Sequence, residues 1–163
     1  MARKRNYVNN PDLLAALIDY RALCKEAEDA GDKNPQVPEY IGKCILLIAT
    51  RLATKPNFSG YSYKDEMISD GIENCLQYIH NFDPEKSNNP FAYFTQIIWY
   101  AFLRRIHKEK KQMYIKFKAS QQQNHELNIL NSAGDQVPQN ELPDYINEFV
   151  DEFEQKHKTK KKK

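Results

Sequence analysis

The sequence has few of the residue patterns from which catalytic and metal sites are built. Its three cysteines, Cys24, Cys44 and Cys75, lie far apart, and no CxxC pair or Cys/His cluster with zinc spacing occurs. There is no glycine-rich phosphate loop and no HExxH motif, and the four histidines are dispersed. We therefore expect no enzyme, no metal and no cofactor, and three buried, reduced thiols.

Long hydrophobic runs are also missing. The most apolar stretches, 45–48 and 97–103, are short and flanked by charged residues, so neither could span a bilayer. The basic N-terminus is followed by no apolar core of signal-peptide type. No run of alternating polar and apolar residues is long enough to indicate a sheet. These absences predict an all-α cytoplasmic protein without a membrane partner.

The 163 residues are enough for one modest core with appendages, and 40% of them are hydrophobic. The net charge of +2 conceals a segmented pattern. Residues 104–118 hold seven Lys/Arg and one Glu, residues 141–154 hold six acids and no base, and residues 156–163 hold six lysines. Such segregation indicates more than one surface for partners.

Apolar residues recur at helical spacing in four segments, with capping residues at several of their ends. Asn10, Ser62 and Asn89 are the expected caps, and Gly31 ends the first helix. The second helix, 39–54, is apolar nearly all round, which is typical of a central core helix. We expect a disordered basic arm at 1–10, a compact helical bundle at 11–118, a flexible linker at 119–140 and an acidic-hydrophobic segment with a lysine tail at 141–163.

The third helix is expected to bury a face that includes Met67 and Leu76 and to present a carboxylate-rich opposite face. Gly71 in its middle costs about 1 kcal/mol of helix stability relative to alanine, so we expect another backbone to come close there. Glu66 and Asp70 could hold a cation at their i, i+4 spacing, but a solvated acidic face is the simpler interpretation. The face consists of Glu66, Ser69, Asp70, Glu73, Asn74 and Gln77.

The fourth helix carries more aromatic side chains than one helix can bury. Phe91, Tyr93, Phe94, Trp99, Tyr100 and Phe102 fall within twelve residues. Tyr93, Gln96 and Tyr100 share one stripe that continues to Arg104, whereas we expect Trp99 to be packed. Exposed rings can stack on unpaired bases, and cations can hold backbone phosphates. We therefore predict binding to single-stranded or melting DNA, with phosphates held by Arg104, Arg105, Lys108, Lys110 and Lys111.

These residues carry a resemblance to a known family. The run E66-M-I-S-D-G71, followed by F82-D-P and then by F91-A-Y-F-T95 and A101-F-L-R-R-I106, resembles region 2 of the bacterial sigma-70 family. Over roughly residues 6–118 the chain is similar to the late-transcription sigma factors of T-even-type bacteriophages. The resemblance implies a promoter-recognition subunit that directs bacterial core RNA polymerase to AT-rich late promoters, in the cytoplasm of an infected host.

The resemblance also implies roles for individual residues. Tyr93 matches the aromatic that stacks on the flipped adenine of the −10 promoter element. Gln96 and Ile97 fall where housekeeping sigma factors carry a tryptophan pair, which this chain lacks. Tyr100 and Arg104 match positions that face the upstream edge of the element. The resemblance implies that Glu66, Ser69, Asp70 and Leu76 grip the coiled coil of the polymerase β′ subunit. Glu73, on the same acidic face, is expected to join this contact.

The C-terminal segment has two open interpretations. Its apolar residues, one face of a short helix, could bind the replication sliding clamp, as the resemblance implies, with a late co-activator as a further partner. The same face could instead fold back on the bundle and place its acids near Arg104–Lys111. The face consists of Leu142, Tyr145, Ile146, Phe149 and Phe153.

Two other functions remain open from the sequence. A polymerase-binding phage regulator would need the acidic helix but not Tyr93 and its neighbours. A nonspecific basic helical nucleic-acid-binding protein would need the cations but not Glu66 and Asp70.

Overall fold

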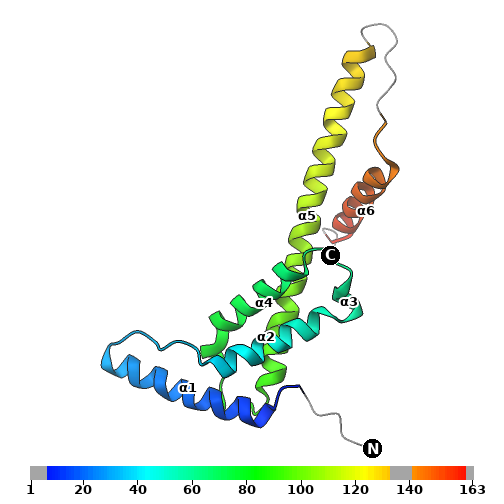
Figure 1. The fold of residues 1–163 in the computed structure, drawn as a ribbon. Helices are drawn as coiled ribbons and strands as arrows, with labels where there is room; N and C mark the ends of the chain where they lie inside the picture. The colour runs from blue at the N-terminus through cyan, green and yellow to red at the C-terminus, as the bar shows by residue number, and fades with distance from the viewer. Residues whose placement is uncertain (1–6, 133–140, 161–163) are drawn as a thin grey trace, which may run out of the picture. The chain divides into compact units, whose positions relative to one another are not determined.

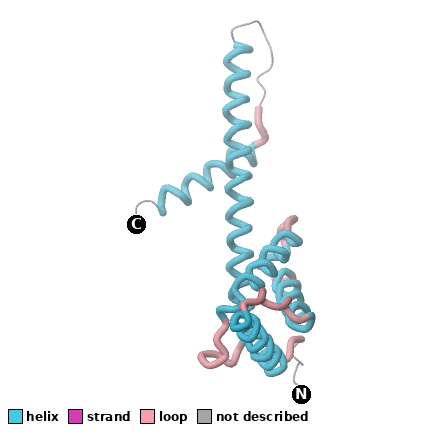
Figure 2. The backbone as a smooth tube through the Cα atoms, turned by 90° about the vertical axis from the view of Figure 1, so that its left-hand side faces the viewer, coloured by secondary structure: helices cyan, strands magenta, loops and turns pink. Residues whose placement is uncertain are grey.

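The computed structural model describes residues 7–132 and 141–160, and these residues form only helices, turns and loops (Figures 1 and 2). The expected all-α fold is confirmed. The chain divides into two compact units, an N-terminal unit Met1–Arg105 and a C-terminal unit Ile106–Lys163. The helices are α1 (Asn10–Ala30), α2 (Glu39–Ala53), α3 (Pro56–Ser59), α4 (Lys64–Tyr78) with the short turn η1 (Ile79–Asn81), α5 (Pro90–Ser132) and α6 (Asp144–Lys160).

The core of the N-terminal unit forms where α2 packs against α1 and α4 (Figure 1). Leu13 and Leu17 of α1 and Met67 of α4 are buried at this core, as the helical spacing predicted. On α2 the buried face is Ile41, Cys44, Ile45, Ile48, Ala49, Leu52 and Ala53.

The helix α2 is central to the core, as expected, but not all of its apolar side chains are buried. Tyr40 and Leu47 are each 42% exposed, and Leu46 is 48% exposed. The reason is that α1 and α4 cover only part of the helix surface, so these side chains share the exposed side of α2 with Glu39, Lys43 and Arg51.

The segment preceding α1 is packed from Tyr7 onward, in contrast to the basic arm expected over 1–10. Val8 is buried. The Tyr7 ring meets Phe91 edge-on at 5.7 Å, and the Arg51 guanidinium lies 5.4 Å from the Tyr7 centroid. Residues 1–6 lie outside the described part of the chain. A cation–π contact and an aromatic pair therefore hold the start of the fold against α2 and α5.

Asn10 does not cap its own helix but serves the start of α5. Its Oδ1 accepts a hydrogen bond from the Phe91 N–H at 3.0 Å, and its Nδ2 donates to Asn89 Oδ1 at 3.1 Å. Asn89 Oδ1 also accepts from the Ala92 N–H at 3.1 Å, which confirms the predicted cap. Ser62 caps nothing, because α4 begins at Lys64 with Tyr63 in the cap position.

Gly71 permits close packing, but against side chains rather than the expected backbone. A Cβ at this position would lie 3.1 Å from Ile98 Cγ2 and 3.3 Å from Phe102 Cε1. Gly71 is itself buried. The absent methyl group thus lets α4 lie against two buried side chains of α5.

The helix α5 continues far beyond the predicted end of the bundle. It runs unbroken to Ser132 (Figure 2), so the flexible linker expected over 119–140 is wrong for residues 119–132. Residues 133–140 lie outside the described part of the chain. The division between compact units falls after Arg105 and not after Lys118.

The polar composition of residues 119–132 suggested a linker, because composition alone does not show whether a neighbouring helix supports the segment. Tyr114 and Phe117, which lie just before residue 119, give α5 a face on which α6 packs, and Gln121 within the segment donates a hydrogen bond to Asn147 of α6. Packing of an amphipathic face stabilises a helix whose own propensity is weak.

In the part of the chain that the structure describes, no helix is both long and apolar enough to cross a membrane.

Candidate nucleic-acid and protein interfaces

The helix α4 presents an exposed stripe that is acidic with one apolar residue. Glu66, Ser69 and Glu73 are exposed, and Leu76 is 41% exposed although its spacing had also placed it in the core. The Ser69 hydroxyl donates to the Asp65 carbonyl at 2.9 Å, which holds that side chain against the helix. We call Glu66, Ser69, Glu73 and Leu76 the acidic stripe. It offers carboxylates and one apolar contact to a cationic partner surface.

Asp70 does not belong to this solvent-facing set. Its side chain is 28% exposed, and its carboxylate accepts two hydrogen bonds from Arg105, Nε at 2.6 Å and Nη2 at 2.7 Å. Asp70 was predicted to face a polymerase and Arg105 to face DNA, but the structure pairs the two side chains with each other. Their bidentate geometry is the strong form of an arginine–carboxylate interaction.

The helix α5 presents a second exposed stripe in the same unit. Gln96 and Arg104 are exposed and Tyr100 is 53% exposed, while Ile97 is half-buried. We call Gln96, Tyr100 and Arg104 the α5 stripe. It combines an amide, a ring and a cation on successive helical turns, which suits a base edge, a base face and a phosphate. Lys108, also predicted to bind DNA, is exposed and belongs to the C-terminal unit.

Tyr93 is partly withdrawn from the surface, although it was predicted to stack on a base. Its hydroxyl donates to the Tyr78 carbonyl at 2.7 Å, and its ring lies 5.2 Å from Phe82 and 5.4 Å from Phe94. Burial raises the pKa of the Tyr93 hydroxyl. Tyr100 is therefore the more accessible ring on this face of α5.

Trp99 packs within the unit, as the sequence predicted. It is half-buried, and its ring meets Phe58 edge-on at 4.8 Å. Phe58 is 1% exposed and also meets Phe102 at 5.1 Å. This aromatic cluster fixes the rotation of α5 about its axis, and hence which side chains its exposed stripe contains.

The turn between α4 and α5 is held by a residue that the sequence did not single out. Arg21 of α1 donates to the Phe82 carbonyl at 2.8 Å and lies 3.7 Å from the Asp83 carboxylate. The pKa of Asp83 is lowered by a hydrogen bond from the Glu85 backbone N–H, by Lys86 and by Arg21. An arginine on a helix surface carries no local signal of such a long-range contact, so sequence reasoning missed it.

The cysteines are free and buried, as expected. Burial raises the pKa of the Cys75 thiol to about 12, which keeps it protonated and unreactive at neutral pH. Among the described residues, no group of three or more His, Cys, Asp or Glu side chains is placed to hold a metal ion.

In the C-terminal unit, the predicted clamp-binding face packs on α5 of the same chain. Phe149 meets Phe117 at 5.4 Å, and Phe153 stacks on Tyr114 at 4.4 Å with the rings 14° apart. Ile146 is 7% exposed, whereas Tyr145 is 61% exposed and Leu142 is half-buried. The apolar face of α6 is thus largely occupied.

A carboxylate also links α6 to α5. Glu154 accepts hydrogen bonds from the Tyr114 hydroxyl at 3.0 Å and from Lys118 Nζ at 2.8 Å. The sequence interpretation that folds α6 back had placed its acids near Arg104–Lys111. The contact that forms lies beyond this range, because the aromatic partners of α6 are Tyr114 and Phe117.

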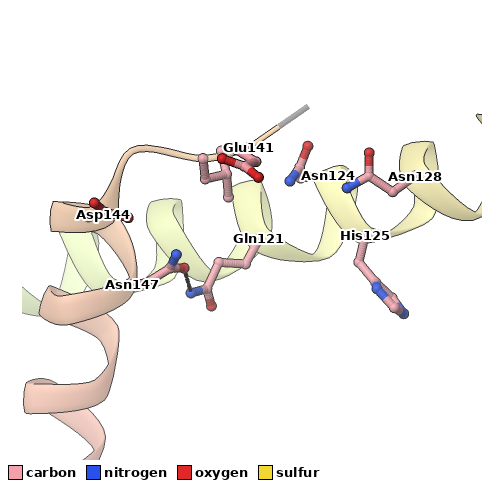
Figure 3. A pocket seen from close by; sticks show the side chains of 8 residues that line it. Gln121, Asn124, His125, Asn128, Glu141, Asp144 and Asn147 are labelled. Carbon is pink, nitrogen blue, oxygen red and sulfur yellow. Dashed lines mark hydrogen bonds between the residues drawn. The ribbon is translucent and has the colours of Figure 1, made fainter. Parts of the chain in front are cut away.

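An open polar groove of about 610 Å³ lies between α5 and the start of α6 (Figure 3). Gln121 Nε2 donates to Asn147 Oδ1 at 2.6 Å at one end of it. The amide side chains that line the groove can donate and accept hydrogen bonds, but none of its charged side chains is buried. The groove is lined by Gln121, Asn124, His125, Asn128, Glu141, Leu142, Asp144 and Asn147.

The fold and its surfaces define a helical protein with an acidic stripe on α4 and an aromatic-cationic stripe on α5. Comparison of the sequence with models of known protein families and with curated proteins gives no match.

Proposed function

We propose that this chain is a sigma-type promoter-recognition subunit. It binds bacterial core RNA polymerase through the acidic stripe of α4 and AT-rich, −10-like promoter DNA through the α5 stripe. The observation that carries the proposal is the presence of both stripes on adjacent helices of one compact unit, in the order and spacing of the motif that resembles sigma region 2. Late promoters of a bacteriophage are the expected targets, inside the infected host cell.

The acidic stripe suits a protein partner better than a nucleic acid. Glu66 and Glu73 are exposed, and carboxylates repel phosphates while attracting a basic helix surface. Leu76, 41% exposed at the end of the stripe, adds an apolar contact of the kind that interface cores contain.

The α5 stripe supports binding to an unpaired strand rather than to duplex DNA. Tyr100 provides an exposed ring on which a base can stack, and Arg104 one turn later can hold a phosphate. Tyr93 contributes to base stacking only if its hydroxyl leaves the Tyr78 carbonyl. We therefore assign the main stacking role to Tyr100 and a secondary one to Tyr93.

Clamp binding by the C-terminal segment requires a change in the C-terminal unit. The face that would bind a clamp includes Ile146, Phe149 and Phe153, which now pack against or beside α5. A sliding clamp, or a late co-activator, would have to displace α6 from Tyr114 and Phe117 before it could bind this face.

The test is reconstitution with a bacterial core RNA polymerase on a template that carries only an AT-rich −10-like element. Specific transcription that depends on the protein is the expected result. The double charge reversal Glu66→Lys/Glu73→Lys should abolish co-purification with core polymerase, because it opposes the sign of the partner surface. The matched control Glu26→Lys/Asp29→Lys changes the same charge on exposed positions of α1 and should bind normally.

Three results would refute the proposal. Equal polymerase binding by both double variants would show that α4 is not the contact. Polymerase binding without any promoter-dependent transcript would favour a polymerase-binding regulator, and DNA binding without polymerase binding would favour a nonspecific nucleic-acid-binding protein.

A further inference from the structure

The side of α5 that faces away from α6 carries exposed apolar and charged side chains. Tyr114, Phe117 and Gln121 contact α6, so they define one face of the helix. At 3.6 residues per turn, the opposite face carries a different set of side chains, and all of them are exposed. We call this set the back stripe: Ile115, Lys116, Ala119, Gln123, Glu126 and Leu127.

Large apolar side chains lie in the back stripe and just beyond it. Ile115 and Leu127 are 56% and 44% exposed, and Leu130, three residues further on, is 70% exposed. The helix is unbroken through this stretch and ends at Ser132 (Figure 2). Large exposed apolar side chains on one helix face, rimmed by polar residues, indicate a protein interface.

The two halves of the back stripe complement each other about residue 121. Ile115 and Leu127 lie at equal distances in sequence on either side of residue 121, and both are apolar. Lys116 and Glu126 also lie at equal distances from it, and they carry opposite charges. The stripe therefore matches itself when its direction is reversed.

A two-fold axis produces this kind of match. In an isologous dimer, residue i of one copy contacts residue j of the other, and residue j of the first copy contacts residue i of the second. When two α5 helices pack antiparallel with the axis beside residue 121, Ile115 meets Leu127 and Lys116 meets Glu126, each pair twice. An unrelated partner would impose no relation between the two halves of the stripe.

The centre and the charges of the back stripe also suit a second copy. Ala119 would face Gln123 of the other copy across the axis, and its small side chain permits a short distance between the helix axes. Among the described residues, neither Lys116 nor Glu126 forms an ion pair within the chain, so both charges are available to a partner. The two charges cancel, so the stripe offers no net positive charge to phosphates.

We propose that the back stripe of α5 is the contact surface of an antiparallel homodimer. The helix α6 keeps its place in this dimer, because it packs on the other face of α5. The proposal goes beyond the proposed function and does not depend on it, since no residue of the back stripe is assigned to polymerase or to promoter DNA. One helix pair forms a small interface, so we expect a dissociation constant on the order of 10–100 µM.

Sedimentation equilibrium of the full chain, over roughly 1 µM to 1 mM protein, tests the proposal. The wild type should change from monomer to dimer across this range. Lys116→Glu should stay monomeric, because it sets two carboxylates against each other at both ends of the interface, and Glu126→Lys should do so with two cations. The matched controls Lys110→Glu and Glu148→Lys change exposed charges outside the back stripe and should dimerise as the wild type does.

Mixing the variants tests which residues face each other. An equimolar mixture of Lys116→Glu and Glu126→Lys should form a dimer although neither does so alone, because opposite charges then meet at both ends. The double variant Lys116→Glu/Glu126→Lys should dimerise with itself. Ile115→Ala should raise the dissociation constant roughly tenfold, since one substitution removes an apolar contact at two places.

Disulfide cross-linking determines the direction of the two helices. The native cysteines are buried, so a cysteine added at the surface reacts first. Under copper–phenanthroline oxidation, Gln112→Cys mixed with Leu130→Cys should give a cross-linked dimer. Gln112→Cys alone should give none, because its two copies lie about 27 Å apart along the axis of an antiparallel pair.

Several outcomes would overturn the inference. A wild type that stays monomeric over the whole range would leave the back stripe to a different partner. A dimer that forms equally well with Lys116→Glu and with Glu126→Lys would place the interface elsewhere, and cross-linking of Gln112→Cys to itself would show a parallel pair. If a single charge variant loses the helical circular dichroism of the wild type, the double variant and the cross-linking result decide.

Discussion

The two units of this protein are held together in different ways. In the N-terminal unit, Phe58, Phe94 and Phe102 are at most 1% exposed and pack within a core of several helices. In the C-terminal unit, Ile106, Ile146 and Val150 are the buried apolar residues among those described, and the rings between α5 and α6 are half-buried. Dense packing fixes a surface rigidly, whereas a two-helix contact of half-buried rings opens at lower free energy.

Under the proposed function, this difference suits the two units to different tasks. A surface that must hold a base, a phosphate and a polymerase in fixed register belongs on the rigid unit, where both stripes are found. A helix that must leave its place to meet a clamp or co-activator belongs on the weakly held unit, where α6 lies.

The largest expected effect is on the stability of the N-terminal core. Phe102→Ala should lower the free energy of unfolding by about 3–5 kcal/mol, because the ring is fully buried and the cavity cannot close. Denaturant unfolding followed by Trp99 emission measures it. A loss no larger than that of Phe149→Ala in the C-terminal unit would show that the two units do not differ as described.

Truncation of the aromatic contact should release α6 without unfolding the N-terminal unit. Phe153→Ala removes the ring stacked on Tyr114 at 4.4 Å, a change expected to cost roughly 1–3 kcal/mol of local stability. Amide hydrogen exchange should speed up across Asp144–Lys160 while the buried amides of α2 stay protected. Equal acceleration in α2 would contradict an independent α6.

Exposed tyrosines of the two units should differ in their effect on DNA. Tyr100 and Tyr145 are 53% and 61% exposed, so neither change to alanine should greatly affect folding. In an assay without a clamp, Tyr100→Ala should lose roughly 1–3 kcal/mol of binding to an unpaired strand, and Tyr145→Ala should lose none. Permanganate reactivity of promoter thymines provides a second readout, and equal loss in both variants would refute the α5 stripe.

The smallest effect concerns pH and is confined to the C-terminal unit. Hydrogen bonds from Lys118 and Tyr114 lower the pKa of Glu154 from its ordinary 4.5, so this contribution to α6 packing is present above that pH and is lost as pH falls through the lowered value. The same contacts raise the pKa of Lys118 above 10.5 and that of Tyr114 above 10.0, so their contribution is lost as pH rises through the raised values.

Amide exchange of α6 across a pH series, corrected for the intrinsic exchange rate, measures this dependence. Glu154→Gln should remove the loss on the acid side and leave the N-terminal unit unchanged. An unaltered acid-side profile in Glu154→Gln would show that this carboxylate does not help to hold α6.

Much of the fold follows from local patterns that need no partner. The helical spacing of apolar residues gave α1, α2 and α4 to within a few residues, and Asn89 with Pro90 marked the start of α5. These features follow from short-range rules of capping, proline geometry and helix periodicity. The same periodicity placed Glu66, Ser69 and Glu73 on an exposed face of α4 and Gln96, Tyr100 and Arg104 on one of α5. It placed Leu76 in the core, although this side chain is 41% exposed.

What the sequence by itself determined is therefore the all-α class, most helix starts and the faces that carry charge and rings. The tertiary structure alone decided which of those charges face solvent. Asp70 and Arg105 are 35 residues apart and are joined only because Gly71 lets α4 lie against Ile98 and Phe102. The packing of α6 on α5 was likewise decided by tertiary contacts, since Tyr114 and Phe117 gain aromatic partners that no local pattern specifies. Contacts between residues distant in sequence depend on how helices pack, and one-dimensional periodicity carries no information about that geometry.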